Sequence, residues 1–100
     1  MRRGEIWSYQ PVLARPGQSL LRLIISADFI NDSESTTVIG LHIIERDLES
    51  LLSPRIGELG WANVMTIEAV MRRRLTEHVG TATDDEMTAV TAALRAAQDL

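Results

Sequence analysis

The stretch from Leu20 to Ala27 restricts the fold of this chain more than any other segment. Its sequence, LLRLIISA, is aliphatic except for one arginine and two small residues. A short apolar run between turn signals is typical of a strand that is buried on both faces. Pro16 and Gly17 precede the run, and polar residues follow it at 28–35. We therefore expect a buried strand at 20–27, with Arg22 as the single charge inside it.

Other segments have the alternation or the β-branched content of strands. The run at 4–12 alternates, and the run TTVIGLHII at 36–44 is rich in β-branched residues. Gly40 inside the second run indicates a bulge or a close backbone approach. A further strand is expected at 57–64, and two short strands around the arginine triplet are expected within 65–79, which also fits a helical stripe. The remaining polar segments are expected to be loops, at 28–35 and at 45–55 with one helical turn at 48–52.

The C-terminal segment has the signature of a helix with a defined start. Thr83 and Glu86 are spaced as a capping box, and acidic residues occupy the first turn. Apolar residues then recur at helical spacing. We predict a helix from Asp84 to Gln98 that packs by its apolar face. About five strands followed by one helix give an α+β fold, a small curved sheet or barrel, in a single domain of residues 1–100.

Composition excludes several classes of function. The chain contains no cysteine, which rules out disulfides, thiolate metal sites and a cysteine nucleophile. Its two histidines lack nearby carboxylates at ligand spacing, so we expect no metal and no cofactor. The net charge of −4 opposes general binding of nucleic acid through its phosphates. Neither a signal peptide nor a membrane-spanning run is found, so we expect a cytoplasmic protein.

Several short motifs follow one another in a recognisable order. They are RRGEIW at the start, Ser26 followed by Asn31, the strand Thr37-Val38-Ile39, and RLTEHVGTATDDEM near the end. This order resembles that of the MazF/PemK toxins of bacterial type II toxin–antitoxin systems. The resemblance implies a small SH3-like barrel with a C-terminal helix, as in CcdB and MazF. It also implies a homodimer, metal-independent cleavage of single-stranded RNA, and inhibition by a small cognate antitoxin protein. The loop at 12–19 would then be the flexible flap beside the active site.

The positions that carry catalysis in this family are occupied by aliphatic residues here. The family's arginine falls at Leu20, and its Thr or Ser falls at Ile44. Neither side chain can transfer a proton or bind a phosphate. Arg22 and His42 each lie two residues from these positions, on the same face of their strands. An arginine for the phosphate and a histidine for proton transfer would suffice. The resemblance therefore predicts Arg22 and His42 as catalytic residues, with RNA contacts from Arg15, Ser19, Glu5 and Trp61.

Each candidate also has a structural interpretation. Arg22 could be a charge on an edge strand, paired with Glu34, Glu45 or Asp28. His42 could be a half-buried structural histidine, and Trp61 a core or interface residue.

The function has alternatives as well. The favoured one is a sequence-specific endoribonuclease toxin. The second is a non-catalytic toxin that binds a protein such as DNA gyrase, as CcdB does, or an inactive relative. The third is a plain interaction domain.

Overall fold

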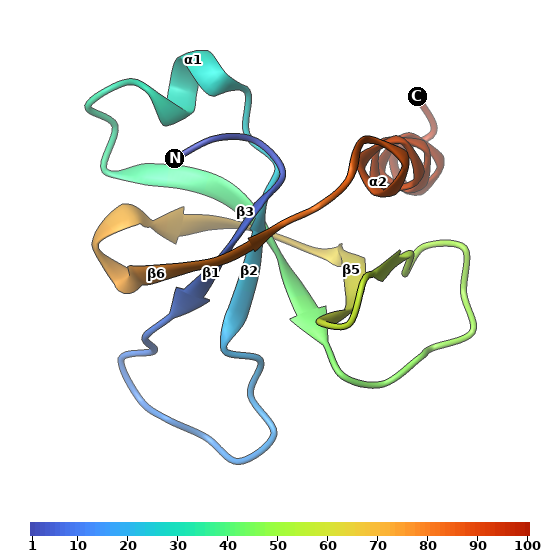
Figure 1. Ribbon diagram of the computed structural model, residues 1–100, viewed down its shortest axis with the longest axis horizontal. Helices are drawn as coiled ribbons and strands as arrows, with labels where there is room; N and C mark the ends of the chain where they lie inside the picture. The colour runs from blue at the N-terminus through green and yellow to red at the C-terminus, as the bar shows by residue number, and fades with distance from the viewer.

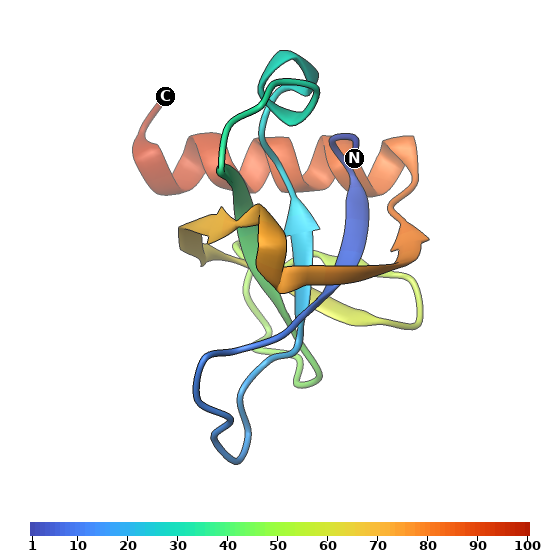
Figure 2. The same ribbon diagram turned by 90° about the vertical axis from the view of Figure 1, so that its left-hand side faces the viewer.

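The chain forms one antiparallel sheet of six strands with a helix packed on one of its faces, in a computed structural model of residues 1–100 (Figures 1 and 2). The strand order across the sheet is β4-β5-β3-β2-β1-β6. A three-residue 3-10 turn, Arg72–Arg74, joins β5 to β6. The elements are β1 (Glu5–Tyr9), β2 (Leu21–Ile24), α1 (Asp28–Asn31), β3 (Thr37–Ile44), β4 (Arg55–Ile56), β5 (Gly60–Met71), β6 (Leu75–Thr81) and α2 (Asp84–Gln98). The predicted α+β class is confirmed.

The two faces of the curled sheet bury separate apolar clusters. The larger cluster lies under α2 and joins Leu23 and Leu41 of the sheet to Val90 of the helix. The smaller cluster lies on the other face, where Ile24 and Val38 pack with neighbouring apolar residues. Since β2 occupies the middle of the sheet, its residues alternate between the two clusters. The predicted burial of this strand on both faces is therefore confirmed for β2, but β2 covers only Leu21–Ile24 of the predicted 20–27, and Leu20 is 54% exposed.

The C-terminal helix begins and ends where the sequence predicts. Thr83 Oγ1 accepts the backbone N–H of Glu86 at 3.1 Å, and Glu86 Oε1 accepts the backbone N–H of Thr83 at 2.8 Å. These reciprocal bonds satisfy two donors that a helix start leaves free, which fixes the first turn of α2.

Neither helix combines the length and apolar character that crossing a membrane requires.

Two predicted segments differ in the structure. The sequence predicted one strand at 57–64 and a separate short strand after it. This division is wrong, because Gly60–Met71 forms a single strand of 12 residues. The register with β3 shifts between Gly40 and His42, and this bulge breaks the alternation that sequence periodicity relies on. The bulge at Gly40 was predicted. The segment 28–35 begins with the short helix α1, because the Asn31 amide folds back on Ser26 O at 2.9 Å.

The loop at 45–54 contains no helix, so the helical turn suggested at 48–52 is also not formed.

Arg72 links the turn after β5 to the loop after α1. Its guanidinium donates to the backbone oxygens of Asn31 at 2.9 Å and Ser35 at 3.0 Å. The arginine triplet therefore has a structural role in at least its first member.

Gly60 provides a test of how the sheet closes at β4. Its φ is +132°, and a Cβ there would collide with the backbone oxygen of Ile44. We expect Gly60→Ala to lower the free energy of unfolding by about 3 kcal/mol or more, from backbone strain and overpacking together. Gly17→Ala is the matched control, because its φ is +77° but nothing lies within 4 Å of the added carbon. That variant should lose only about 1–2 kcal/mol in a urea titration. Equal losses would contradict the packing described here.

Candidate functional site

Arg22 lies buried in the centre of the sheet and is held on all sides. Only 2% of the residue is exposed, and β2 has a strand on either side, so the interpretation as an edge charge is wrong. Its Nε donates to Glu68 Oε1 at 2.6 Å, and its Nη1 donates to the backbone oxygens of Ser19 and Leu21. The guanidinium also lies over the Tyr9 ring, 4.1 Å from the centroid. The partner of Arg22 is therefore Glu68, and not one of the three acidic residues proposed from sequence.

The structure brings the two predicted catalytic residues together. Arg22 and His42 are direct partners in the β2–β3 register, and both side chains contact the same carboxylate. His42 Nε2 lies 3.1 Å from Glu68 Oε1, the oxygen that also accepts from Arg22. The three residues form a continuous polar chain, which we call the Arg22–Glu68–His42 chain.

Gly40 allows this chain to form across three strands. Glu68 lies on β5 directly opposite Gly40, so its carboxylate must cross β3 to reach Arg22 on β2. A Cβ at Gly40 would lie 3.7 Å from the Arg22 Cβ and 3.0 Å from a methyl group of Val70. The missing side chain leaves the passage open. The adjoining bulge is closed by Thr66, whose Oγ1 accepts the backbone N–H of His42 at 2.9 Å.

The surroundings of His42 favour a neutral imidazole. Burial lowers the pKa of His42 and the nearby Arg22 charge lowers it further, while Glu68 opposes both effects, and the net pKa lies below 6.5. A neutral imidazole donates through one ring nitrogen and accepts through the other. If Nε2 donates to Glu68, Nδ1 keeps its lone pair. The side chain is 28% exposed, so the imidazole is partly open to solvent. This arrangement can accept a proton at neutral pH.

A cavity adjoins the chain where the family's catalytic positions fall. Extending the β2–β3 register by one more pair on the same face places Leu20 opposite Ile44. Both residues line a cavity of about 470 Å³ together with Ser19 and Arg46. Ser19 is fixed there, since its hydroxyl donates to the backbone oxygen of Ile43 at 2.5 Å. Arg46 is exposed and forms no ion pair, so its charge is free.

The other predicted RNA-binding residues are spread over the surface. Trp61 is opposite Ile44 on β5, and the Arg55 guanidinium lies 5.3 Å from its ring centroid, so both border the same face as His42. Arg15 is exposed in the loop between β1 and β2 and lines a separate cavity of about 270 Å³.

Glu5 has a different role. It accepts from the Trp7 Nε1 at 3.0 Å and from the backbone N–H of Arg2 at 3.0 Å. Burial raises the pKa of Glu5, but these hydrogen bonds outweigh it and the net pKa is lowered. Trp7 stacks on His78 in turn, with ring centroids 5.5 Å apart. Glu5 belongs to this cluster at the β1–β6 pair and does not contact the Arg22–Glu68–His42 chain.

Sequence reasoning missed Glu68, the residue that connects the site. It is the only charged residue within β5, which is otherwise apolar or neutral. A lone charge in an alternating segment was a usable signal that Glu68 has a special role. Its proximity to Arg22 could not be predicted, because it depends on the bulge between Gly40 and His42. No group of three or more His, Asp or Glu side chains is placed to hold a metal ion.

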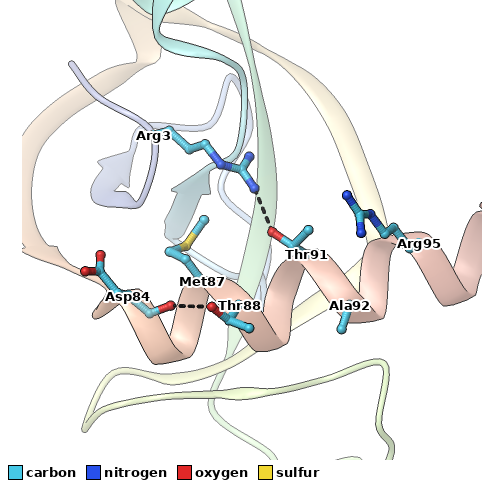
Figure 3. Close-up of a pocket in the computed structure, with 7 residues that line it drawn as sticks. All are labelled: Arg3, Asp84, Met87, Thr88, Thr91, Ala92 and Arg95. Atoms are coloured by element: carbon cyan, nitrogen blue, oxygen red, sulfur yellow. Dashed lines mark hydrogen bonds between the residues drawn. The ribbon is translucent and has the colours of Figure 1, made fainter.

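A further cavity, of about 450 Å³, lies beside α2 and is lined by residues of a different kind (Figure 3). Arg3 reaches down to α2, where its Nη2 donates to Thr91 Oγ1 at 3.0 Å, and Arg95 lies one turn further along. None of the residues that the sequence predicts for the site lines this cavity. We therefore place the candidate site at the Arg22–Glu68–His42 chain.

Comparison with known proteins identifies the family. A model of the PemK-like, MazF-like toxins of type II toxin–antitoxin systems matches residues 2–97. The chain belongs to this toxin family. No curated protein matches this toxin significantly in sequence.

Solved structures share the fold of this toxin at low sequence identity. An endoribonuclease from a mycobacterial species is 20% identical with a TM-score of 0.83, covering 100% of this chain and 92% of its own. A mycobacterial endoribonuclease in complex with its cognate antitoxin is 19% identical with a TM-score of 0.86, covering 100% and 96%. MazF from Deinococcus radiodurans is 15% identical with a TM-score of 0.77, covering 99% and 96%. The curled sheet with its C-terminal helix is therefore the fold of these proteins.

The pKa of His42 tests the geometry of the site directly. A titration followed by NMR of the imidazole should give a pKa below 6.5, because burial and Arg22 disfavour the charged ring. Glu68→Gln should lower it further, since the carboxylate is the group that favours the imidazolium. The NMR spectrum of the remaining residues serves as the control that Glu68→Gln leaves the fold unchanged. A His42 pKa above 6.5, or one that rises in Glu68→Gln, would contradict the described contacts.

Proposed function

We propose that this toxin is a metal-independent endoribonuclease that cleaves single-stranded RNA, with His42 as its proton acceptor. The observation that carries the proposal is the Arg22–Glu68–His42 chain. It joins an arginine, a carboxylate and an imidazole on one face, next to the positions where the family resemblance places catalysis. Family membership and the similarity to mycobacterial endoribonucleases support the choice of RNA as substrate.

The proposed reaction uses the ribose 2′-hydroxyl as nucleophile. His42 Nδ1 takes the hydroxyl proton as O2′ forms a bond to the adjacent phosphorus, and the bond from phosphorus to O5′ breaks. A proton from water completes the 5′-hydroxyl, and the imidazolium returns its proton to solvent. The products are a 2′,3′-cyclic phosphate and a 5′-hydroxyl end. A positioned general base of this kind contributes about 10²–10⁴-fold to the rate.

Glu68 and Arg22 act as positioning residues in this proposal. Glu68 accepts from His42 Nε2, which fixes the ring and stabilises the imidazolium that forms during the reaction. Arg22 holds the Glu68 carboxylate in place through its Nε. Arg22 is almost fully buried, and its Nε and Nη1 are bonded within the protein. Nη2 has no partner in the protein and is therefore the one atom of Arg22 to which we assign a phosphate contact.

The adjoining cavity is suited to the RNA backbone. It is bordered by the fixed Ser19 and by the free charge of Arg46, which can neutralise a phosphate. Trp61 borders the same face and offers a surface on which a base can stack. In this arrangement Leu20 and Ile44 contact the nucleotide as apolar neighbours and take no part in proton transfer.

The family also supplies the proposed partners. A solved complex of a mycobacterial endoribonuclease contains its cognate antitoxin, and complexes of MazE with MazF are known from Deinococcus radiodurans. We propose that this toxin binds a small cognate antitoxin, acts in the cytoplasm and forms a homodimer.

RNA cleavage by purified, antitoxin-free protein in the presence of EDTA tests the proposal. We expect His42→Ala to reduce the rate by about 10²-fold or more, because it removes the general base. Arg22→Lys should reduce it less, since an ammonium can still pair with Glu68. His78→Ala, the other histidine, should leave cleavage unchanged, and thermal melting should show that each variant is folded.

Two outcomes would overturn this function. The first is no cleavage of any single-stranded RNA by the wild-type protein. The second is an undiminished rate in His42→Ala. If the wild-type protein inhibits growth without cleaving RNA, the non-catalytic function of binding a protein target such as DNA gyrase becomes the better account.

A further inference from the structure

The cavity beside α2 brings together two arginines that have no acidic partner. Its volume is about 450 Å³, and Arg3, Thr91 and Arg95 are among the residues that line it. Figure 3 shows Arg3 reaching from the N-terminal segment to Thr91, with Arg95 on the same side of the helix. Neither arginine forms an ion pair, so two uncompensated positive charges border one cavity.

The carboxylate of Asp28 lies near the Arg3 backbone but is compensated by another residue. One of its oxygens accepts the backbone N–H of Arg3 at 2.7 Å, and the other pairs with the Arg2 guanidinium at 2.9 Å. The positive charge of the Arg3 side chain therefore remains for a ligand.

Internal hydrogen bonds hold the Arg3 guanidinium in position and still leave it donors. Its Nη1 donates to the backbone oxygen of Ile25, and its Nη2 donates to Thr91 Oγ1 at 3.0 Å. A guanidinium carries more N–H groups than these two bonds use, so others remain for a ligand. Because the side chain is already ordered, binding through it costs little further conformational entropy.

Thr91 and Arg95 add donors on the same side of α2. Thr91 Oγ1 accepts from Arg3, and its own hydroxyl proton has no acceptor within the protein. Thr88 differs, since its hydroxyl donates to Asp84 O at 3.0 Å. Arg95 follows Thr91 by four residues, which places both on one face of the helix. The Arg95 side chain makes no hydrogen bond within the protein.

This set of donors favours a doubly charged anion. An arginine has no acceptor, and the Thr91 oxygen already accepts from Arg3, so the three side chains can only donate to a ligand. A phosphate monoester carries a charge of about −1.5 to −2 at neutral pH, which two guanidinium groups can match. Each phosphodiester group of a nucleic-acid backbone carries a single negative charge and would match the pair less well.

The charges at the two ends of α2 oppose a long polyanion in this cavity. Asp84, Asp85 and Glu86 occupy the first turn, and Asp99 follows the last turn. A nucleic-acid strand that ran along the helix would meet these carboxylates on both sides of the two arginines. A small ligand avoids this repulsion, because only its phosphate group needs to lie at Arg3 and Arg95.

We propose that Arg3, Thr91 and Arg95 bind the phosphate group of a small phosphate monoester of nucleotide size. The cavity is larger than a phosphate and continues along α2 past Met87 and Thr88 to Asp84. The distance along the helix axis from Thr91 to Asp84 is about 10 Å. The organic part of the ligand would contact Met87, and its hydroxyl or amino groups would donate to the Asp84 carboxylate.

The proposed phosphate site is separate from the candidate site for RNA cleavage. Leu23 packs in the cluster under α2, and the side chain of its neighbour Arg22 lies on the opposite face of the sheet. The phosphate site therefore goes beyond the proposed function and does not depend on it.

An NMR titration of the full chain at constant ionic strength tests the site, with inorganic phosphate and adenosine 5′-monophosphate as probes. Both should shift the backbone amides of Thr91 and Arg95 in a saturable way, and the nucleotide should bind more tightly. Arg95→Gln should weaken both at least tenfold, because it removes one of the two charges. Arg73→Gln is the matched control, since Arg73 is an exposed arginine far from α2 in the chain and should leave binding unchanged.

A second pair of variants tests the hydroxyl donor without changing any charge. Thr91→Val keeps the shape of the side chain and should also weaken binding of the nucleotide. Thr88→Val is its control, because Thr88 lines the same cavity but its hydroxyl is bonded within the helix. Circular dichroism establishes that all four variants are folded.

A 2′-O-methyl oligonucleotide without terminal phosphates distinguishes a monoester from a nucleic-acid backbone. It cannot be cut through its 2′ oxygens, and it should not shift the amides of Thr91 and Arg95. The proposal is overturned if the nucleotide leaves these amides unshifted, if Arg95→Gln and Arg73→Gln bind it equally well, or if the oligonucleotide shifts them more than the nucleotide does. None of these results bears on whether RNA is cleaved.

Discussion

The ion pair between Arg22 and Glu68 is the interaction on which the rest of the site depends. A guanidinium in the centre of a sheet loses nearly all of its hydration, and this loss is costly unless the charge is paired and its N–H groups are bonded. Here a carboxylate, two backbone oxygens and an aromatic ring replace the water. The pair in turn determines where Glu68 can lie, and hence where His42 finds its hydrogen-bond partner.

The ion pair depends on two features of the backbone, the glycine at position 40 and the bulge beside it. Gly40 leaves room for a carboxylate to cross a strand, and the bulge beside it brings Thr66 under the backbone N–H of His42. A buried pair of this kind often stabilises no better than well-packed apolar residues would. Its value in this fold is positional, because it holds an imidazole with a lowered pKa at a solvent-accessible point of the sheet.

Much of the architecture could be predicted from sequence, and the exceptions have physical causes. The capping box at Thr83 and the apolar run around Leu23 depend on local chemistry and periodicity. The helix was placed correctly, and the buried strand was found, although it is shorter than the predicted 20–27. Sequence also placed Arg22 and His42 each on the same face as the family's catalytic position in its strand, since two residues along a strand return to the same side. The partner of Arg22 was missed because Glu68 reaches it only through the register of three strands and a bulge. The continuity of β5 was missed for the same reason.

The family and the site are supported by different kinds of observation. The family rests on a match over nearly the whole chain and on a shared fold, whereas its usual catalytic positions hold Leu20 and Ile44 here. The β2–β3 register, extended, places Leu20 opposite Ile44, and the polar chain starts two residues further along the same ladder, at Arg22 and His42. In the proposed function the chemistry is displaced along this ladder, which needs no change of architecture and only a change in which residue pair meets the substrate.

A double-mutant cycle on the rate of RNA cleavage tests the central claim most directly. The variants are Glu68→Gln, His42→Asn and the two combined. If Glu68 acts by positioning His42, each single substitution removes the same function, and the double variant should be no slower than the slower single variant, within about threefold. If the two losses multiply, the residues act independently, and the Arg22–Glu68–His42 chain is not the working unit of this toxin.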